Sequence, residues 1–446
     1  MANSVDAGEK RWQSVSAKES PMSERRPLFL TCLSVKPRIT HIALALVLAI
    51  AGGVVAPSAH AQSISLLHLF SGPDGVEPEG TLTMDRAGNL YGTTTFGGAG
   101  YGTVFKLSRA GTGWILSTLY TFTGGADGAS PTGAVVFGPD GSLYGTTDGG
   151  GANSAGTVFN LRPPVSICHS VSCPWSETVL HSFSISDGAE PYWESLIFDS
   201  AGSIYGTTAG GGLRCSCGLV FKLAKSDGGW NETVLYFFTG MNDGKTAYGS
   251  LAFDSAGNLY GTTYQGGAYD GGTLYELSKT GAAWTETTLQ AFSGSGPQGG
   301  NPYAGPAIDQ QGNLYGTTSG GGSGNGGTVY QLQRTGNGWT FNILYSFNGF
   351  GKPLDTPTFD AAGNLYATSS QGGINGTGNV FKLTQGSNGW SYFDLFDFSG
   401  DFSNGYAPIG GVVLDSSGNI YGTTAGGGNQ QGCPDGGCGL IYEIIP

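Results

Sequence analysis

From residue 62 onward, the hydrophobic residues fall into short runs that are separated by glycine-rich polar stretches. The runs are rich in β-branched and aromatic residues and are about five residues long or longer, as is typical of β-strands. Four of them follow one another at 250–254, 258–263, 273–277 and 284–292. This part of the chain shows no helical periodicity. The pattern therefore predicts an all-β protein built from sheets of four short strands.

The four runs belong to a unit that occurs seven times. Its most regular part reads Gly-Asn-Leu-Tyr-Gly-Thr-Thr at residues 88–94, and successive copies are 51 to 61 residues apart. The tyrosines of the copies stand at positions 91, 144, 205, 260, 315, 366 and 421. A repeat of this length is typical of a solenoid or a propeller.

The two ends of the repeated region favour a closed ring. The seventh unit ends at Pro446 after three runs, whereas a run at 65–70 precedes the first unit and resembles the fourth run of the other units. An N-terminal strand that completes the last sheet closes a propeller and leaves few free edges. We therefore predict that residues 62–446 form one domain, a seven-bladed β-propeller. Its blades are four-stranded and antiparallel, and the N-terminal strand closes the last blade.

Two features of the repeat are interpreted as structural. An aspartate three residues before a glycine can accept hydrogen bonds from the amides of its own turn, while the glycine takes a positive φ. A tryptophan at the start of the fourth run fits the packing between blades, because a ring buries the same wedge at each interface. The aspartates are Asp85, Asp199, Asp254, Asp309, Asp360 and Asp415, and the tryptophans are Trp114, Trp175, Trp230, Trp284, Trp339 and Trp390.

The residues before position 62 have the features of a secretory signal peptide. An apolar segment at 42–56 follows a basic and polar region and precedes Ala59-His60-Ala61. The segment is short for a membrane span, and the small residues suit cleavage after Ala61. We therefore expect residues 1–61 to be removed, the remaining chain to have no membrane span, and the protein to be secreted or periplasmic.

Net charge restricts the partners of the exported chain. The leader contains seven of the 19 Lys and Arg residues and four of the 32 Asp and Glu residues, which leaves 12 basic and 28 acidic residues. Such an acidic surface repels phosphate backbones and anionic lipids. Nucleic acids and membranes are therefore unfavourable partners, and we expect a monomer that binds a glycan, a peptide or a protein.

Six cysteines of the exported chain form three close pairs: Cys168 with Cys173, Cys215 with Cys217, and Cys433 with Cys438. An even number in an exported chain favours local disulfides. For Cys215 and Cys217 the expectation is evenly balanced, because one intervening residue makes a strained ring. A zinc site shared by the second and third pairs is excluded, since these pairs lie on blades almost opposite each other in the ring.

The candidate binding residues lie in loops that the fold places around one end of the channel, where propellers bind ligands. An Asp-Gly pair recurs in the loops that enter each blade, and we interpret it as a turn, with an acidic ligand site as the alternative. Aromatic residues outside the repeat pattern are better candidates, because packing symmetry does not require them. Aromatic rings suit stacking on the C–H faces of sugars, and carboxylates beside them suit hydrogen bonds to sugar hydroxyls. The candidates are Asp187, Glu190, Tyr192, Trp193, Glu194, Asp243, Tyr248, Tyr303 and Tyr406.

Histidines give no sign of catalysis. His68 and His181 occupy a fourth-strand position that is Tyr120 and Tyr236 in other units, so we interpret both as structural substitutes. No nucleophile and base can be paired. We expect no cofactor and no His-based metal site, with calcium as the one ion that the acidic loops could take.

The repeat resembles that of a known family. It combines Asp-x-x-Gly-Asn-Leu-Tyr-Gly-Thr-Thr, a glycine-rich segment, Gly-Thr-Val-Phe-Lys-Leu and Gly-Trp-x-x-x-x-Leu-Tyr-x-Phe, and is similar over residues 64–446 to the GloVer (Gloeobacter and Verrucomicrobia) repeat, a choice-of-anchor family. The resemblance implies an exported, repeat-built β protein of unassigned activity. Our first hypothesis is a binding module. The alternative is a secreted propeller enzyme, a polysaccharide lyase or glycosidase, with Asp187, Glu190 and Glu194 as acid and base.

Overall fold

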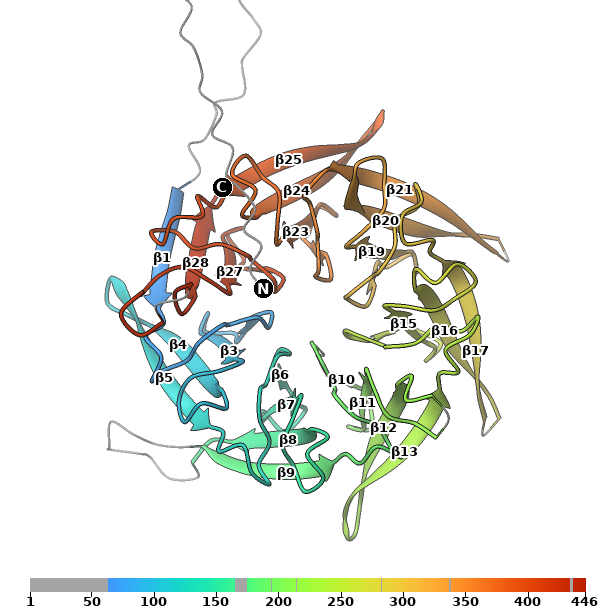
Figure 1. Cartoon of the computed structure of the whole chain (residues 1–446), viewed down its shortest axis with the longest axis horizontal. Helices are drawn as coiled ribbons and strands as arrows, with labels where there is room; N and C mark the ends of the chain where they lie inside the picture. Colours follow the sequence, from blue (N-terminus) through green and yellow to red (C-terminus); the bar gives the residue numbers. More distant parts are fainter. Residues whose placement is uncertain are drawn as a thin grey trace, which may run out of the picture. The chain divides into compact units, whose positions relative to one another are not determined.

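The computed structural model describes residues 63–164, 175–193, 195–213, 215–281, 283–336, 338–433 and 436–446. These residues form seven four-stranded sheets that are arranged radially around a central axis (Figure 1). The predicted seven-bladed propeller is therefore confirmed. The described residues contain no helix, and hence none that is long and apolar enough to cross a membrane.

Each blade begins with a two-residue inner strand, which is followed by longer strands toward the rim. Blade 1 contains β2 (Thr83–Met84), β3 (Leu90–Thr94), β4 (Thr103–Ala110) and β5 (Gly113–Thr121). Blade 2 contains β6 (Val136–Phe137), β7 (Leu143–Thr147), β8 (Thr157–Arg162) and β9 (Ser176–Ser182). Blade 3 contains β10 (Ile197–Phe198), β11 (Ile204–Thr208), β12 (Leu219–Ser226) and β13 (Gly229–Phe237). Blade 4 contains β14 (Ala252–Phe253), β15 (Leu259–Thr263), β16 (Thr273–Thr280) and β17 (Ala283–Ala291).

The remaining blades follow the same plan. Blade 5 contains β18 (Ala307–Ile308), β19 (Leu314–Thr318), β20 (Asn325–Thr335) and β21 (Gly338–Asn348). Blade 6 contains β22 (Thr358–Phe359), β23 (Leu365–Ser369), β24 (Asn379–Gly386) and β25 (Gly389–Asp397). Blade 7 contains β26 (Val413–Leu414), β27 (Ile420–Thr424), β28 (Leu440–Ile445) and the N-terminal β1 (Ser63–Leu69). The inner strands are shorter than the runs that predicted them: in blade 4 the run at 250–254 contains only the strand Ala252–Phe253, and Ser250 at its start lines the channel.

The ring closes as predicted. Strand β1 pairs antiparallel with β28, and Leu66 faces Tyr442 across the pair. The first and last strands of the described chain therefore share one sheet, and the edge that a three-stranded seventh blade would expose is covered.

The turn aspartates act within their own blade, as predicted. In blade 1, Oδ1 of Asp85 accepts hydrogen bonds from the amides of Ala87 and Asn89, at 2.9 Å each. Its Oδ2 accepts from the side-chain amide of Asn89 at 2.7 Å and from the Tyr91 hydroxyl at 3.1 Å. These four bonds hold the carboxylate charged and lower its pKa, although burial acts in the opposite direction.

Blade 2 reaches the same result with a different residue. Gly138 stands at the turn position, and Asp140 supplies the carboxylate from two residues later. Its Oδ2 accepts from the Tyr144 hydroxyl at 3.1 Å. The two blades therefore share a carboxylate that accepts from the motif tyrosine, although their turn sequences differ.

The motif tyrosine is the wedge between neighbouring blades. The Tyr91 ring of blade 1 lies edge-on to Phe137 of blade 2, at 5.1 Å between centroids, and 6.5 Å from the ring of Trp175. The same contact joins blade 7 to blade 1, where Trp114 lies 6.1 Å from Tyr421. The interpretation of the repeated tryptophans as inter-blade packing is therefore confirmed for these interfaces.

The two threonines of the motif have different partners. Thr93 donates its hydroxyl to the backbone oxygen of Gly133 in the next blade, at 2.7 Å. Thr94 instead contacts the hydroxyl of Thr103 in its own blade, at 2.8 Å. One threonine therefore links blades near the channel, and the other fixes the pairing of β3 with β4.

The loops that enter each blade lie beside the loops between its second and third strands. Isolated antiparallel bridges join the two in six blades, for example Ala189 with Gly210 in blade 3 and Lys245 with Gln265 in blade 4. We call the end of the ring formed by these loops the loop face.

Two of the three predicted disulfides lie in the described residues, and both are formed: Cys215 with Cys217, and Cys433 with Cys438. Cys168 and Cys173 lie outside the described residues.

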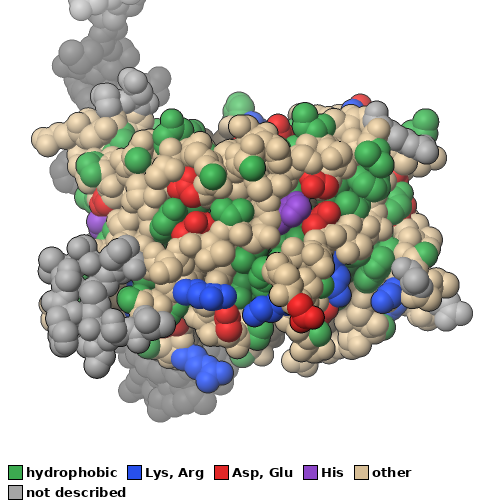
Figure 2. Space-filling model, turned by 90° about the horizontal axis from the view of Figure 1, so that it is seen from below, with side chains coloured by type: hydrophobic (Ala, Val, Ile, Leu, Met, Phe, Trp, Pro, Cys, Tyr) green, Lys and Arg blue, Asp and Glu red, His purple; other side chains and the backbone are tan. Residues whose placement is uncertain are grey.

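Charged side chains are unevenly distributed over the rim. On the side of the ring shown in Figure 2, acidic side chains gather mainly in the upper half and Lys and Arg mainly in the lower half. Several cations have structural contacts: Lys106, Lys222 and Lys382 lie 4.9 to 5.3 Å from the ring centroids of the motif tyrosines of their own blades. These contacts are cation–π interactions, so these three cations contribute to the packing of their own blades.

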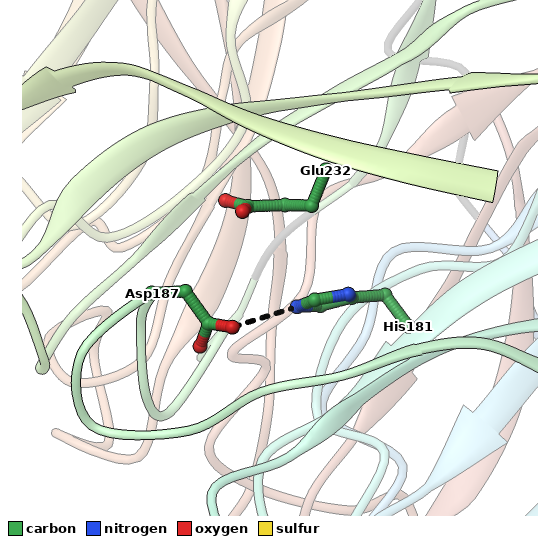
Figure 3. A group of neighbouring side chains, drawn as sticks. All are labelled: His181, Asp187 and Glu232. Atoms are coloured by element: carbon green, nitrogen blue, oxygen red, sulfur yellow. Dashed lines mark ion pairs between the residues drawn. The ribbon is translucent and has the colours of Figure 1, made fainter.

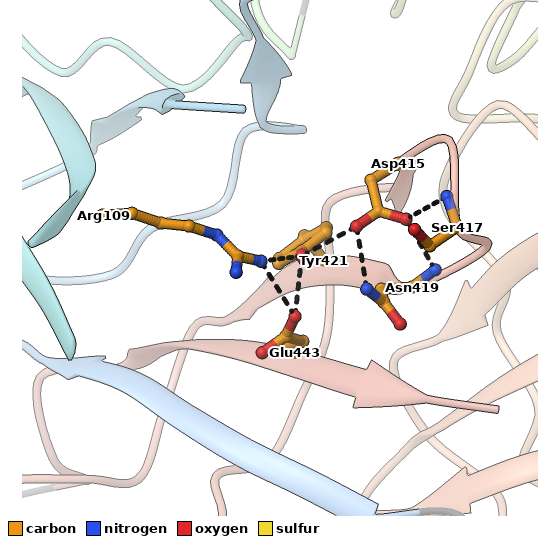
Figure 4. Close-up of polar contacts among 6 residues, drawn as sticks. All are labelled: Arg109, Asp415, Ser417, Asn419, Tyr421 and Glu443. Carbon is orange, nitrogen blue, oxygen red and sulfur yellow. Dashed lines mark hydrogen bonds and ion pairs between the residues drawn. The ribbon is translucent and has the colours of Figure 1, made fainter. Parts of the chain in front are cut away.

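The interface between blades 7 and 1 contains an additional polar cluster (Figure 4). The Tyr421 hydroxyl donates to Glu443, which is 2.7 Å away, and accepts from the Arg109 guanidinium at 2.9 Å. Arg109 belongs to blade 1, whereas Tyr421 and Glu443 belong to blade 7. The cluster therefore ties the first complete blade to the last one.

Replacement of Tyr421 by phenylalanine should weaken this interface. The buried Glu443 carboxylate would lose its nearest donor, at a cost of about 1 to 3 kcal/mol. Tyr366→Phe is the matched control, because the Tyr366 hydroxyl contacts only the turn carboxylate of Asp360, at 3.2 Å, and its loss should cost about 0.5 to 1.5 kcal/mol. Denaturant unfolding of the two variants measures the difference, and equal losses would contradict a special role of the cluster.

Candidate functional site

The loop that enters each blade delivers one side chain to the mouth of the channel. One residue of the loop takes a left-handed backbone, with φ between 52° and 60° in all seven blades, and its amide bonds to the preceding blade. In blade 3 this residue is Glu190, whose amide donates to Ala155 at 3.0 Å. A proline follows the left-handed residue in six blades. The residue two positions after the left-handed one faces inward. These inward residues are Glu79, Thr132, Tyr192, Tyr248, Tyr303, Leu354 and Ile409.

Blade 3 has one residue more than the other blades at this point. The buried Leu196 follows Tyr192 by four positions, whereas Leu251 follows Tyr248 by three. Trp193 occupies the additional length and takes a left-handed backbone, with φ of 51°. For a large residue this backbone is unfavourable and persists only where the surroundings enforce it.

Trp193 reaches across the mouth of the channel. Its amide donates to Oγ1 of Thr132 in blade 2 at 3.1 Å, and its indole Nε1 donates to Oε2 of Glu79 in blade 1 at 3.2 Å. The indole of a blade 3 residue is therefore held by two other blades. These contacts explain how the strained backbone is maintained.

Three tyrosines contact Trp193, and a fourth, Tyr264, contacts two of them. Tyr192 lies 4.6 Å from Trp193, and Tyr303 lies 5.0 Å from it. Tyr248 stacks on Tyr303, with 5.5 Å between centroids and 7° between planes. Tyr264 lies 4.5 Å from Tyr303 and 5.4 Å from Tyr248. We call Tyr192, Trp193, Tyr248, Tyr264 and Tyr303 the aromatic cluster; all five side chains are half-buried.

Carboxylates lie beside the aromatic cluster, since Glu79 accepts from Trp193 and the charges of Glu190 and Asp148 act on Tyr248. Burial raises the pKa of Glu79, although its hydrogen bonds from Trp193 and Thr95 favour the charged form. Burial also raises the pKa of Asp148 to about 6, and the charges of Glu190 and Glu79 act in the same direction. Glu190 itself is exposed. The mouth therefore combines aromatic faces with three carboxylates, of which one titrates near neutral pH.

The channel below the mouth is narrow. The cavity there measures about 50 Å³ for the centres of water-sized molecules and is lined by residues from several blades, among them Trp193, Tyr303 and Asp355. Such a space holds roughly three to five water molecules. A larger ligand would therefore rest on the mouth rather than enter the channel.

The structure brings some of the predicted residues together and leaves others apart. Tyr192, Trp193, Tyr248 and Tyr303 lie in the aromatic cluster, and Glu190 lies close enough to Asp148 to affect its pKa. Asp243 is buried and accepts from the Tyr236 hydroxyl of β13 and from the Thr239 amide of its own loop. Tyr406 lies beside blade 7, where its hydroxyl donates to the backbone oxygen of Gly436. Asp187 lies beside His181 and Glu232 (Figure 3), and Glu194 lies outside the described residues.

Four residues of the mouth and channel were not among the predicted ones: Glu79, Asp148, Tyr264 and Asp355. Asp148 and Tyr264 directly follow the Gly-Thr-Thr motif, at a position where other units have Thr, Ala or Ser. Asp355 stands where the corresponding residues are Gly80, Gly133, Gly249, Ala304 and Gly410. Comparison of the repeats position by position would therefore have found these residues, because each departs from its small or uncharged counterparts.

Fold and loop geometry together define the class: a seven-bladed β-propeller whose repeated core is regular and whose loop face is specialised in blades 1 to 5. Its sequence assigns the family. The model of the Gloeobacter/Verrucomicrobia repeat matches residues 49–172, 167–352 and 282–446, and the chain belongs to this family. The resemblance of its repeat is thereby confirmed.

Solved structures share the fold at low sequence identity. The extracellular domain of a proposed hybrid two component system from B. thetaiotaomicron is similar with a TM-score of 0.53 and 12% identity over 86% of this chain. A second structure of an extracellular domain from B. thetaiotaomicron, of a proposed one component system, gives a TM-score of 0.51 at 12% identity over 86% of the chain. This chain spans 39% and 40% of the lengths of those two chains.

A polysaccharide lyase, an ulvan lyase bound to a saccharide, matches with a TM-score of 0.47 and 10% identity over 82% of this chain and 90% of its own. No curated protein sequence matches the chain.

The buried Asp355 should make stability depend on pH. Its pKa is raised to about 8 by burial, and only the amide and hydroxyl of Thr368 and its own amide favour the charged form. An unfolded aspartate has a pKa near 3.9, so the folded state holds the proton more tightly. The stabilising contribution is complete below about pH 4 and is lost as the pH rises toward 8.

Asp355→Asn should therefore reduce the fall in unfolding temperature between pH 5.5 and pH 8. The fall should not vanish, since the pKa values of Glu177, Glu232 and Glu286 are also raised, to about 7. Asp401→Asn, at an exposed aspartate, is the control and should keep the wild-type pH dependence. Differential scanning fluorimetry over this range measures the effect, and an unchanged fall in Asp355→Asn would show that Asp355 is ionised in the folded protein.

Proposed function

We propose that the protein is an exported binding module that holds a carbohydrate at the mouth of its channel. Three features of the chain support export: the leader at residues 1–61 with the pattern of a signal peptide, the two disulfides, and the low number of cations in the rest of the chain. The leader would be removed after Ala61.

The observation that carries the proposal is the aromatic cluster beside carboxylates. Stacked or tilted rings of Tyr248, Tyr303 and Trp193 offer apolar faces to the C–H faces of a sugar, and carboxylates accept hydrogen bonds from its hydroxyls. The cluster does not follow from the packing symmetry of the ring. In the corresponding inward positions, blades 1, 2, 6 and 7 have Glu79, Thr132, Leu354 and Ile409.

Charge narrows the carbohydrate class. Glu79, Asp148 and Glu190 stand at the mouth, and acidic residues outnumber basic ones by 28 to 12 after residue 61. This field repels uronic-acid and sulfated polymers. The proposed ligand is therefore a neutral or amino-sugar glycan, which lies across the mouth because the channel is too narrow to admit it.

Removal of aromatic rings should weaken binding. Tyr303→Ala deletes the ring that contacts three other members of the cluster, and an arrayed neutral or amino-sugar glycan that binds the wild type should bind at least about 10-fold more weakly, as expected for the loss of about 1.4 kcal/mol. Tyr269→Ala is the matched control, because Tyr269 is 67% exposed on the loop face outside the cluster. Calorimetry with the array hit measures both variants. An array without any hit, or equal binding by both variants, would contradict the carbohydrate proposal.

A second candidate function is acid–base catalysis on a glycan. It is favoured by one observation: Asp148, with its pKa raised to about 6, stands close to the ionisable Glu190 and Glu79. General acid–base chemistry on glycosidic bonds uses a pair of carboxyl groups, one of which gives a proton to the leaving group.

Asp148→Asn separates the two candidates. An enzyme should lose turnover of the bound glycan by at least about 100-fold, because the variant cannot transfer the proton. A binding module should show no product with either protein, and its affinity should change little. A reducing-end assay on the array hit measures turnover. Product formation at an equal rate by wild type and Asp148→Asn would rule out Asp148 as the acid.

A further inference from the structure

A recurring group of three side chains lies between neighbouring blades, away from the channel mouth. Its members are a residue of the outer strand of one blade, the aspartate of the loop that enters the next blade, and a glutamate two residues after the tryptophan of that next blade. Between blades 3 and 4 they are Tyr236, Asp243 and Glu286, and the Tyr236 hydroxyl donates to Asp243 at 2.9 Å. Between blades 1 and 2 they are Tyr120, Asp127 and Glu177, with 3.1 Å between Tyr120 and Asp127. The tyrosine satisfies the aspartate directly in both groups.

Between blades 2 and 3, histidine replaces the tyrosine. His181 of β9, Asp187 of the entry loop and Glu232 of β13 each offer one possible ligand atom, and these atoms lie within 4.8 Å of one another (Figure 3). The distance from Nε2 of His181 to Oδ2 of Asp187 is 3.5 Å. No other such group of three occurs in the described part of the chain.

The 3.5 Å spacing is informative because the chain contains a second His–Asp pair for comparison. At the interface between blades 7 and 1, Nε2 of His68 lies 2.8 Å from Oδ2 of Asp74, which is a direct hydrogen bond. That interface has Leu116 at the position of Glu232. Where the glutamate is present, the histidine and aspartate stand farther apart. Two ligand atoms of a tetrahedral zinc ion, each about 2.0 to 2.1 Å from the metal, lie roughly 3.3 Å apart.

The donor atoms are oriented by their surroundings. Oδ1 of Asp187 accepts from the amide and the hydroxyl of Ser184, at 2.6 and 2.9 Å, which leaves Oδ2 directed at His181. The imidazole of His181 lies edge-on to Phe183, with 4.7 Å between centroids. Such outer contacts fix the orientation of ligands in known metal sites.

Two of the three groups have an unsatisfied buried atom. Nε2 of His181 and Oε1 of Glu232 are buried without a hydrogen-bond partner in the described structure. Buried polar atoms are normally paired, so a partner for Nε2 of His181 is expected at this point; Oε1 of Glu177 in the group between blades 1 and 2 is unsatisfied as well, so the histidine is what distinguishes this group. A cation there would accept the lone pairs of all three side chains.

We propose that His181, Asp187 and Glu232 bind one divalent transition metal ion of the zinc class, which links blade 2 to blade 3. One imidazole nitrogen and two carboxylate oxygens suit Zn²⁺, with water in the fourth position. Calcium is a poor match, because it takes six to eight oxygen ligands and does not favour imidazole. The interpretation of His181 as a mere substitute for tyrosine is thereby replaced.

Zinc binding by the full chain tests the proposal. The protein, purified without a histidine tag and treated with EDTA, should bind one Zn²⁺ per chain in calorimetry at pH 7.5, and its unfolding temperature should rise with added ZnCl₂. His181→Tyr installs the residue of the neighbouring groups and should abolish this site without loss of fold. Tyr236→His creates the same three ligands with Asp243 and Glu286 and should raise the stoichiometry to two.

The proposal is overturned if the wild type and His181→Tyr bind zinc equally, or if the wild type binds none. Circular dichroism in EDTA establishes that each variant is folded. Should His181→Tyr fail to fold, Glu232→Gln, which keeps the shape of the side chain, takes its place and should weaken zinc binding at least 10-fold. Equal affinities of Glu232→Gln and wild type would likewise overturn the assignment.

Discussion

The packing of one tyrosine between neighbouring blades is the interaction on which the ring depends. A single four-stranded sheet cannot bury its two faces, so each blade needs a neighbour on both sides. The motif tyrosine fills the wedge between them, and its hydroxyl is tied to the turn carboxylate of its own blade, as in Tyr91 with Asp85. The aromatic ring of the tyrosine is apolar and its hydroxyl is polar, which suits an interface near the surface of the propeller. Closure of blade 7 by β1 lets this interface occur once more between the last blade and the first.

The symmetry of this core makes departures from it meaningful. A position that serves packing must be filled in the same way in each blade, whereas a position that serves a ligand need not be. Trp193 is an additional residue, Asp355 replaces glycine or alanine, and His181 replaces tyrosine. The first two lie at the channel and the third lies between blades 2 and 3. Each carries a cost that the repeated core does not demand: a left-handed backbone at Trp193, a buried carboxyl at Asp355 and an unsatisfied ring nitrogen at His181.

The sequence was sufficient for the fold and insufficient for the site, for a physical reason. The strand pattern of the unit recurs seven times, and the turn aspartates and inter-blade tryptophans recur six times, so local patterns reinforce one another. The mouth of the channel is formed once, from residues far apart in the chain. Trp193 contacts Glu79, which is 114 residues away in the chain. This contact depends on the curvature of the propeller and on one inserted residue. Tyr192, Tyr248 and Tyr303 could be selected as unusual loop aromatics, but the inclusion of Tyr264 required the pairing of the entry loop with the loop after the second strand.

The proposed metal ligands show the same limit of prediction from the sequence. Considered within its own strand, His181 occupies a tyrosine position, and nothing there distinguishes it from His68. The difference lies in the next blade, where one interface has Glu232 and the other has Leu116. Three separate segments must therefore vary together before a site exists. Because the interfaces between blades are nearly independent units, a change confined to one of them leaves the other six intact, and a propeller can acquire such a site without redesign of its core.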